Sequence, residues 1–255
     1  MLEDIFSVRD KNVLITGAGR GIGRALALAF ADRGANIIVA GRTMTDLEST
    51  AREVRSRGQD VLAIPVDVQS ATSVESLFGT VTRELGHLDV LINNAGVFVN
   101  RPALEMTEAE WNTMADTNVK GVFFCSRAAG RLMMRQGHGR IVNVSSALAR
   151  VAQEGYACYG ANKAAVEQLT RVLALEWARY GINVNAIAPT TTDLPERPER
   201  LRTPEALARA QRNIPLGRYG QPSDLVGAAI YLASAASSFM TGQTLTIDGG
   251  FSLAK

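Results

Sequence analysis

The sequence predicts a single α/β domain over residues 1–255, built on a doubly wound parallel sheet of about seven strands with helices on both faces. Short, nearly continuous apolar and β-branched runs alternate with longer segments of helical period, and such runs are typical of strands buried on both faces. No linker, internal repeat or low-complexity tract divides the chain of 255 residues. This length suffices for one large α/β domain. Strands are expected at 13–16, 37–40, 61–66, 90–93, 141–144, 182–188 and 244–247.

Signals for helix ends lie between these runs. The segments Thr45-x-x-Glu48 and Thr107-x-x-Glu110 predict capping boxes. Thr203 before Pro204 predicts an N-cap followed by a first-turn proline. Left-handed glycines after helices are expected at Gly34, Gly58 and Gly86. Because strand alternates with helix throughout, ligands are expected at the carboxyl ends of the strands.

The composition is that of an ordinary soluble globular protein, with 46% apolar and 20% charged residues. A formal net charge of +2 does not favour nucleic-acid or membrane binding. No basic leader is present, and no apolar run approaches the roughly 18 residues of a membrane span. We therefore expect a cytoplasmic protein that binds neither nucleic acid nor a membrane.

Cysteines and histidines are too few to predict a disulfide framework or a metal centre. Cys125 and Cys158 form no CxxC motif, and His87 and His138 are not clustered in the sequence. A catalytic zinc site usually takes three protein ligands from His, Cys and carboxylates. We assign no metal site, so a carbonyl substrate would have to be polarised by protonated side chains.

A glycine-rich segment follows the first predicted strand directly and opens the first helix. It reads Gly17-Ala18-Gly19-Arg20-Gly21-Ile22-Gly23. Glycines permit a tight turn and let backbone N–H groups approach a pyrophosphate at the helix N-terminus. Glycines at this spacing are a weak signal alone, but their place between strand and helix predicts dinucleotide binding. The cofactor residues expected here are Gly17, Arg20, Gly21, Ile22 and Gly23.

The opening motif Thr16-Gly17-x3-Gly21-Ile22-Gly23 resembles that of the short-chain dehydrogenase/reductase family, which has a Rossmann-type fold. Four further motifs follow in the family's order. They are Asp67-Val68, Asn93-Asn94-Ala95-Gly96, Asn118 within Thr117-Asn118-Val119, and Ser146 thirteen residues before the stretch Tyr159-x3-Lys163. The tail from Thr241 to Gly250 is similar as well, so the resemblance covers essentially the whole chain.

The resemblance implies roles for these residues in an oxidoreductase that interconverts an alcohol and a carbonyl. Tyr159 would be the general acid in reduction and the base in oxidation, and Ser146 would hydrogen-bond the substrate oxygen. Lys163 would hold the nicotinamide ribose, and Asn118 would keep a water in a relay from Lys163 to solvent. Asp67 and Val68 would contact adenine, while Asn94, Ala95 and Gly96 would line the adenine–ribose side.

A physical argument supports the tyrosine–lysine pair. Residues four apart on a helix share a face. An ammonium near a phenol favours the phenolate, so we expect Lys163 to lower the pKa of Tyr159 toward working pH. Alone, such a pair is usually an amphipathic surface feature. Ser145 competes with Ser146 as the catalytic serine, although the thirteen-residue offset favours Ser146. Cys158 is interpreted as a packed thiol rather than a nucleophile.

Charge after the second strand favours NADP(H), with NAD(H) as the alternative. Gly41 stands where family members that use NAD carry Asp, and Arg42 follows where NADP-using members carry a basic residue. A guanidinium suits a 2′-phosphate. Arg20 adds a second cation, although it occurs with both cofactors.

The substrate is less well defined by the sequence. Members of the family usually have Pro-Gly after the sixth strand, followed by a Thr that contacts the nicotinamide amide. Here the sequence at this point is Pro189-Thr190-Thr191-Thr192. We assign cofactor contacts to Pro189 and Thr192. Residues 190–213 are polar and are interpreted as a lid over the substrate.

A free ketone, sugar, polyol or hydroxyacid is the expected substrate. The alternative is a 3-oxoacyl-acyl-carrier-protein reductase, but Gly137 and Tyr180 stand where those enzymes tend to have basic residues. An alternative of another class is a non-catalytic redox sensor. The chain is too short for the second domain usual in dehydrating or epimerising relatives. The family commonly forms homotetramers, and segments 103–136 and 156–180 could supply the helices of that interface.

Overall fold

The computed structural model describes residues 4–194 and 203–254. Of the segment interpreted as a lid, residues 195–202 lie outside the described part, so that prediction is only partly open to inspection. The described residues of this segment include helix α7, Pro204–Asn213.

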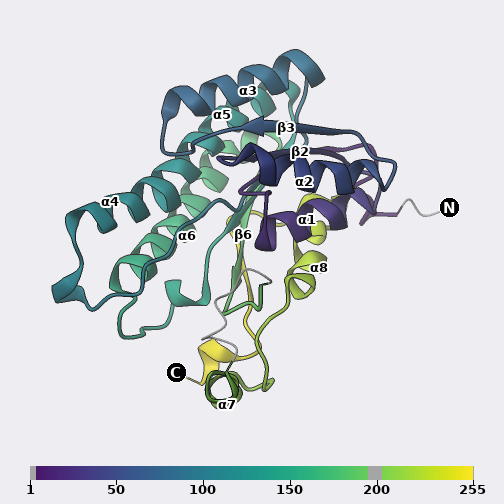
Figure 1. The fold of residues 1–255 in the computed structure, drawn as a ribbon. Helices are drawn as coiled ribbons and strands as arrows, with labels where there is room; N and C mark the ends of the chain where they lie inside the picture. Colours follow the sequence, from purple (N-terminus) through teal and green to yellow (C-terminus); the bar gives the residue numbers. More distant parts are fainter. Residues whose placement is uncertain (1–3, 195–202, 255) are drawn as a thin grey trace.

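A seven-stranded parallel sheet forms the centre of the molecule (Figure 1). The strand order is β3-β2-β1-β4-β5-β6-β7, so the order in which successive strands are added to the sheet reverses between β1 and β4. All seven expected strands are confirmed, with bounds that differ by one or two residues at most. The strands are β1 (Asn12–Thr16), β2 (Asn36–Gly41), β3 (Val61–Pro65), β4 (Val90–Asn93), β5 (Gly139–Val144), β6 (Ile182–Pro189) and β7 (Thr244–Ile247).

Helices cover both faces of the sheet, as Figure 1 shows, so the predicted Rossmann-type fold is confirmed. One face packs against α1 (Gly21–Ala31), α2 (Met44–Arg55) and α8 (Pro222–Ala233) around the fully buried Phe30. The other packs against α3 (Ala71–Leu85), α5 (Gly121–Gln136) and α6 (Ala157–Trp177). Successive strand residues point to opposite faces, so Val13 and Leu14 belong to different cores.

Helix ends confirm most of the predicted signals. Helix α4 (Glu108–Ala115) begins with a complete Thr107–Glu110 capping box. The Thr203 hydroxyl accepts a hydrogen bond from the Ala206 backbone N–H at 3.3 Å, as expected of an N-cap before Pro204. Residues with positive φ follow α1, α2 and α3 at Gly34, Gly58 and Gly86.

The capping box expected at Thr45-x-x-Glu48 is wrong. Helix α2 begins at Met44, so Thr45 already lies inside its first turn. The backbone N–H groups of Asp46 and Leu47 both donate to the Thr43 carbonyl, and these bonds close the first turn two residues earlier than expected. The Thr43 side chain makes no capping hydrogen bond.

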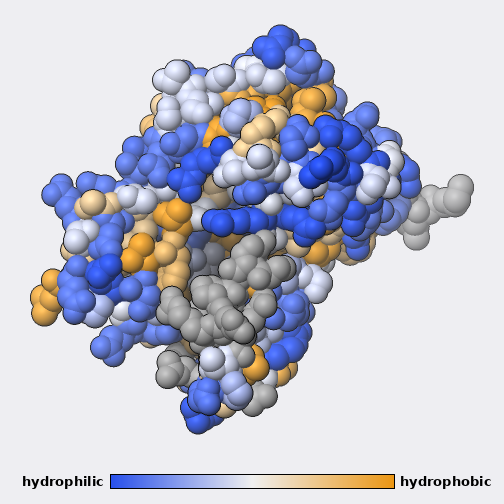
Figure 2. All heavy atoms as spheres, in the orientation of Figure 1, coloured by the Kyte–Doolittle hydropathy of each residue, from blue (hydrophilic) through white to orange (hydrophobic). Residues whose placement is uncertain are grey.

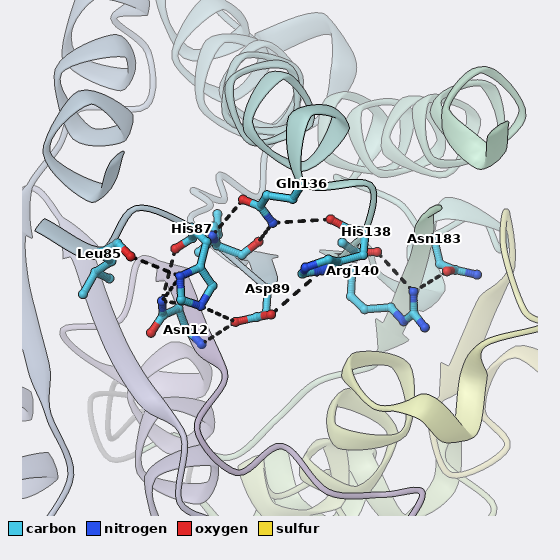
Figure 3. Close-up of polar contacts among 10 residues, drawn as sticks. Asn12, Leu85, His87, Asp89, Gln136, His138, Arg140 and Asn183 are labelled. Atoms are coloured by element: carbon cyan, nitrogen blue, oxygen red, sulfur yellow. Dashed lines mark hydrogen bonds and ion pairs between the residues drawn. The ribbon is translucent and has the colours of Figure 1, made fainter. Parts of the chain in front are cut away.

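The two histidines, described above as unclustered in sequence, lie on either side of Asp89 at the amino edge of the sheet (Figure 3). His87 Nε2 is 3.5 Å and His138 Nδ1 is 3.9 Å from the Asp89 carboxylate. The same carboxylate accepts the Asn12 backbone N–H at 2.9 Å. Within the described residues, no group of three or more His, Cys, Asp or Glu is arranged to hold a metal ion.

Both cysteines are buried and free. Burial raises the pKa of the Cys158 thiol, while Asn162 donates to its sulfur at 3.5 Å. A protonated thiol is a poor nucleophile, which supports the interpretation of Cys158 as a packed side chain. None of the described helices combines the length and apolarity that crossing a bilayer would need.

Candidate active site

A cavity of about 820 Å³ opens at the carboxyl edge of the sheet. Its lining residues follow the ends of β1, β2, β3, β4, β5 and β6, so it spans the crossover between β1 and β4. Loops on either side of such a crossover leave in opposite directions, which opens a crevice between them. The position therefore follows from the strand order.

The glycine loop forms one wall of this cavity and is held from behind by the Asn94 side chain. Asn94 Nδ2 donates to the carbonyls of Thr16 and Gly17 at 2.9 and 3.2 Å. The Thr16 hydroxyl in turn accepts the backbone N–H groups of Asn94 and Ala95, each at 3.1 Å. The family-type motif at 93–96 thus fixes the loop after β1.

Glycine is required in this loop by close backbone approach. Gly17 has φ +68°, and a Cβ there would lie 2.9 Å from Ala95 Cα. A Cβ on Gly23 would overlap the Gly17 carbonyl and the Asn94 amide. Of the predicted loop residues, Gly17, Arg20, Gly21 and Ile22 line the cavity. Gly23 does not line it but allows α1 to start against the loop.

The other predicted cofactor residues are brought to the same cavity. Those on the side of β2, β3 and β4 are Arg42, Asp67, Val68, Asn94, Ala95 and Gly96. Arg42 is exposed directly after β2, and Gly41 offers no side chain at the strand end. Asp46, which the sequence analysis did not single out, also lines this side.

Ser146, Tyr159 and Lys163 meet at the end of β5. Ser146 caps a short 3₁₀ turn, Ala147–Ala149, and its side chain is close enough to the Tyr159 hydroxyl to lower the pKa of that phenol. Tyr159 and Lys163 lie one turn apart on α6, with the Lys163 ammonium 5.6 Å from the centre of the Tyr159 ring. Lys163 Nζ also donates to the Val144 carbonyl at 2.7 Å, which ties α6 to the end of β5.

Burial dominates the protonation of this pair. It raises the pKa of Tyr159 to about 12, although the Ser146 hydrogen bond acts in the opposite direction. Burial also lowers the pKa of Lys163 to about 8. The expectation that Lys163 brings the pKa of Tyr159 down toward neutrality is therefore wrong for these residues by themselves, because desolvation of the phenol is the largest influence and raises its pKa.

Ser145 is engaged elsewhere. Its hydroxyl donates to the Lys163 carbonyl at 3.1 Å and lies 3.4 Å from a Glu167 carboxylate oxygen. Glu167 is buried and accepts Arg150 Nε at 3.1 Å. Ser145 thus anchors α6, whereas Ser146 contacts Tyr159. The sequence analysis missed Glu167, whose only signal is its i+4 spacing from Lys163.

Asn118 does not line the cavity. It is fully buried in a π-helical turn, Asp116–Lys120, between α4 and α5. Its Oδ1 accepts the Val97 backbone N–H, and its Nδ2 donates to the Val97 carbonyl, both at 2.9 Å. The side chain therefore holds the loop after β4.

The segment Pro189 to Thr192 lines the cavity throughout. The Thr192 hydroxyl donates to the Thr190 carbonyl at 3.1 Å, and Thr192 forms a backbone bridge with Gly220. Thr190 and Thr191 border the same space, so the geometry does not single out Thr192 as the contact to a nicotinamide amide.

Aromatic residues that the sequence analysis did not single out complete the site. Phe98 stacks on Tyr156, with ring centres 5.2 Å apart, and meets the Tyr159 ring edge-on at 5.3 Å. Phe98 and Tyr156 both line the cavity, with Leu148 and Leu194. A signal was present: Phe98 comes two residues after the 93–96 motif, at the carboxyl end of β4.

Comparison with known proteins agrees with this geometry. The family model described as enoyl-(acyl carrier protein) reductase matches residues 17–252. Gluconate 5-dehydrogenase of Gluconobacter oxydans is 38% identical over 252 residues, covering 98% of each chain. A 3-oxoacyl-[acyl-carrier-protein] reductase of Staphylococcus aureus is 39% identical over 244 residues, covering 94% of this chain and 97% of the relative.

A solved structure supports the same assignment. Gluconate 5-dehydrogenase of Burkholderia cenocepacia, crystallised with NADP and tartrate, superposes with a TM-score of 0.94 at 36% identity over 99% of each chain. The chain therefore belongs to the short-chain dehydrogenase/reductase family, as an oxidoreductase that acts on CH–OH groups.

Proposed function

We propose that this protein interconverts a secondary alcohol and a ketone with NADP(H) as its preferred cofactor. The observation that carries the proposal is that Tyr159 lines the same cavity as Ser146, Lys163 and the glycine loop, one helical turn from Lys163. A cofactor loop and a proton donor that share one space suit hydride transfer coupled to proton transfer.

The cavity fits a dinucleotide. Because the glycines of the loop carry no Cβ, its backbone can fold tightly and its N–H groups can approach a pyrophosphate at the start of α1. Arg42 and Arg20 would hold a 2′-phosphate, and the missing carboxylate at Gly41 removes the usual partner of an NAD ribose. Lys163 would hold the nicotinamide ribose. A bound cofactor of this class supplies or accepts the hydride at the substrate carbon.

The protein's own residues manage the substrate oxygen. In reduction, Ser146 and Tyr159 donate hydrogen bonds to the carbonyl oxygen, and the Tyr159 proton moves to it as charge develops. In oxidation the same phenolate oxygen removes the hydroxyl proton. The Lys163 ammonium stabilises the phenolate left after reduction. Asn118 would keep a water in a relay that returns the proton from solvent through Lys163.

A second candidate activity is reduction of 3-oxoacyl groups on an acyl carrier protein. The Staphylococcus aureus relative favours it, whereas Gly137 and Tyr180 offer no cations at the expected docking positions. A redox sensor without catalysis is disfavoured, because binding a dinucleotide does not require a buried Ser146–Tyr159–Lys163 arrangement.

We further propose a homotetramer that acts in the cytoplasm on a small-molecule substrate. Exposed apolar side chains on α4, α5 and α6 support helix-to-helix association, and Figure 2 shows apolar atoms on the side where α4 and α6 lie. These side chains are Trp111, Phe123, Val172 and Leu175. Two free buried thiols suit a reducing compartment. Light scattering during gel filtration tests the oligomeric state.

The test of the activity combines cofactor titration with turnover. NADPH and NADH are titrated by fluorescence, and ketone, polyol and acyl-thioester panels are then followed by NADPH absorbance. We expect tighter binding of NADPH, weakened in Arg42→Ala. Turnover should be lost in Tyr159→Phe and retained in Tyr180→Phe, which removes a hydroxyl at the far end of α6. Binding of NADH alone, or full turnover by Tyr159→Phe, would overturn the proposal.

A further inference from the structure

The substrate end of the cavity is bounded by aromatic and apolar side chains. Phe98 lies between the catalytic Tyr159 and Tyr156, edge-on to the first and stacked on the second. It remains 50% exposed despite these two contacts, so one part of its ring faces open space. Leu148 and Leu194 line the same cavity. Aromatic faces of this kind bind flat apolar groups by stacking and by burial of apolar area.

Charged side chains of the described lining are concentrated at the other end. Arg42 follows β2 and Asp67 follows β3, whereas Ser146 follows β5. Neighbouring strands lie about 4.8 Å apart, so three strand spacings place Arg42 roughly 14 Å from Ser146. Arg20 and Asp46 belong to the loop after β1 and the start of α2. These four groups therefore face the adenosine half of a dinucleotide.

Cations near the reacting centre already have partners. Lys163 is buried, and its Nζ donates to the Val144 carbonyl. Arg101, three residues beyond Phe98, pairs with Glu110 at 2.6 Å. Arg150, four residues beyond Ser146, pairs with Glu167 at 3.1 Å. Among the described residues around Tyr159, none offers an uncommitted cation to a substrate carboxylate, and burying a carboxylate without a partner is costly.

We propose that the substrate is a ketone, or the matching secondary alcohol, with an uncharged aromatic ring or similarly flat apolar group close to the reacting carbon. Phe98 is the specificity-determining residue, and its exposed ring face receives that group while Tyr159 and Ser146 hold the oxygen. This inference rests on the proposed function and narrows it. It separates this chain from its relatives named gluconate 5-dehydrogenase, because gluconate has no aromatic ring.

Three ketones of one skeleton test the proposal. They are benzylacetone, its cyclohexyl analogue and its para-carboxy derivative, whose carbonyl groups have equal intrinsic reactivity because none is conjugated with the ring. We expect kcat/KM for benzylacetone to exceed that for the cyclohexyl analogue by about fivefold, the size of an aromatic contact. The carboxylated ketone should be poorer than benzylacetone by about tenfold or more.

Phe98→Leu assigns the selectivity to one side chain. It removes the ring and keeps an apolar side chain of similar reach, so the phenyl-to-cyclohexyl ratio of kcat/KM should fall to about one. Phe6→Leu is the matched control, because Phe6 is 49% exposed and also has an aromatic neighbour, Tyr231, but does not line the cavity. Its ratio should equal that of the wild type.

Saturation-transfer NMR of the same ketones with NADP-loaded Tyr159→Phe reads selectivity without turnover. Strong transfer to the phenyl protons that is lost on adding Phe98→Leu supports the proposal. Equal ratios in wild type and Phe98→Leu, or preference for the carboxylated ketone, overturn it while leaving the oxidoreductase assignment intact. Failure of the proposed function is separate: no ketone or alcohol would then be turned over, and the NMR readout would still decide the binding preference.

Discussion

Polar side chains have different surroundings at the carboxyl edge and at the amino edge of the same sheet. At the carboxyl edge, Lys163 is buried and Tyr159 is partly buried beside an open cavity, and desolvation shifts both of their pKa values by large amounts. At the amino edge, His87, His138 and Asp89 contact one another, and both histidine side chains are more than half exposed (Figure 3).

The difference follows from the topology rather than from residue type. Loops at the carboxyl edge diverge at the β1–β4 crossover, so polar groups there line a cavity between the loops. Polar groups at the amino edge close the ends of the strands with mutual hydrogen bonds. Gln136, for example, bonds both the Leu88 N–H and the Leu88 carbonyl. Burial also lowers the pKa of Arg140 at the amino edge, but of these groups only Tyr159 and Lys163 line the cavity, and the proposed chemistry lies there.

Replacing the buried ammonium should have the largest effect. Lys163→Met is expected to lower kcat/KM by roughly a hundredfold to ten-thousandfold, because it removes the charge that stabilises the phenolate. In the wild type the ammonium form persists below about pH 8 and is lost above it, so the reduction rate should fall as pH rises through about 8. A pH profile of kcat/KM measures this. A rate that rises through the same range would contradict the role.

A methyl group at Gly23 should distort the glycine loop that is proposed to bind the cofactor. Gly23→Ala pushes a Cβ against the Gly17 carbonyl and the Asn94 amide, so we expect a loss of about 1–3 kcal/mol of stability and weaker NADPH binding. Gly79→Ala is the control: nothing lies within 4 Å of a Cβ at this position in α3, and alanine should stabilise the helix by up to about 1 kcal/mol. Fluorescence titration and thermal unfolding measure both effects. Unchanged NADPH affinity in Gly23→Ala would argue against the loop assignment.

Substitution of the buried Glu167 tests how strongly its contacts position the proposed catalytic residues on α6. Glu167→Gln removes the charge that pairs with Arg150 and weakens the tie to Ser145. We expect a loss of about 1–3 kcal/mol in the free energy of unfolding and a fall of up to about tenfold in kcat with NADPH affinity retained. Glu84→Gln, in an exposed pair with Arg83, is the matched control and should change neither quantity. Parallel losses of kcat and NADPH affinity would indicate general loosening instead.

The smallest effect is expected at the amino edge. Asp89→Asn keeps an acceptor for the Asn12 N–H and removes the charge between the two histidines. The free energy of unfolding should change by no more than about 1 kcal/mol, because both histidine partners are more than half exposed and solvent screens the pairs, and kcat/KM should stay within about twofold of the wild type. Urea unfolding and steady-state kinetics measure this. A large fall in turnover would show that the two edges are coupled and would break the comparison.

The sequence by itself determined the strands, their parallel arrangement and the edge at which ligands bind. These features are local: a buried strand needs a short apolar run, and a phosphate loop needs glycines between a strand and a helix. The motif residues Gly17, Asn94, Ser146, Tyr159 and Lys163 could be placed because each follows a strand or shares a helix face. The start of α2 was misplaced, since backbone bonds to Thr43 closed its first turn earlier than the side-chain pattern indicated.

Tertiary structure alone decided what surrounds those motifs. Phe98 meets Tyr156 and Tyr159 only because the loops after β4 and β5 converge over one cavity. The pKa of Tyr159 rises because packing removes water from the phenol, a cost that spacing along a helix does not reveal. Asn118 contacts Val97 across 21 positions, and His87 and His138 meet at Asp89. Such contacts depend on which chain segments the fold brings together, whereas the motifs depend on neighbours in sequence.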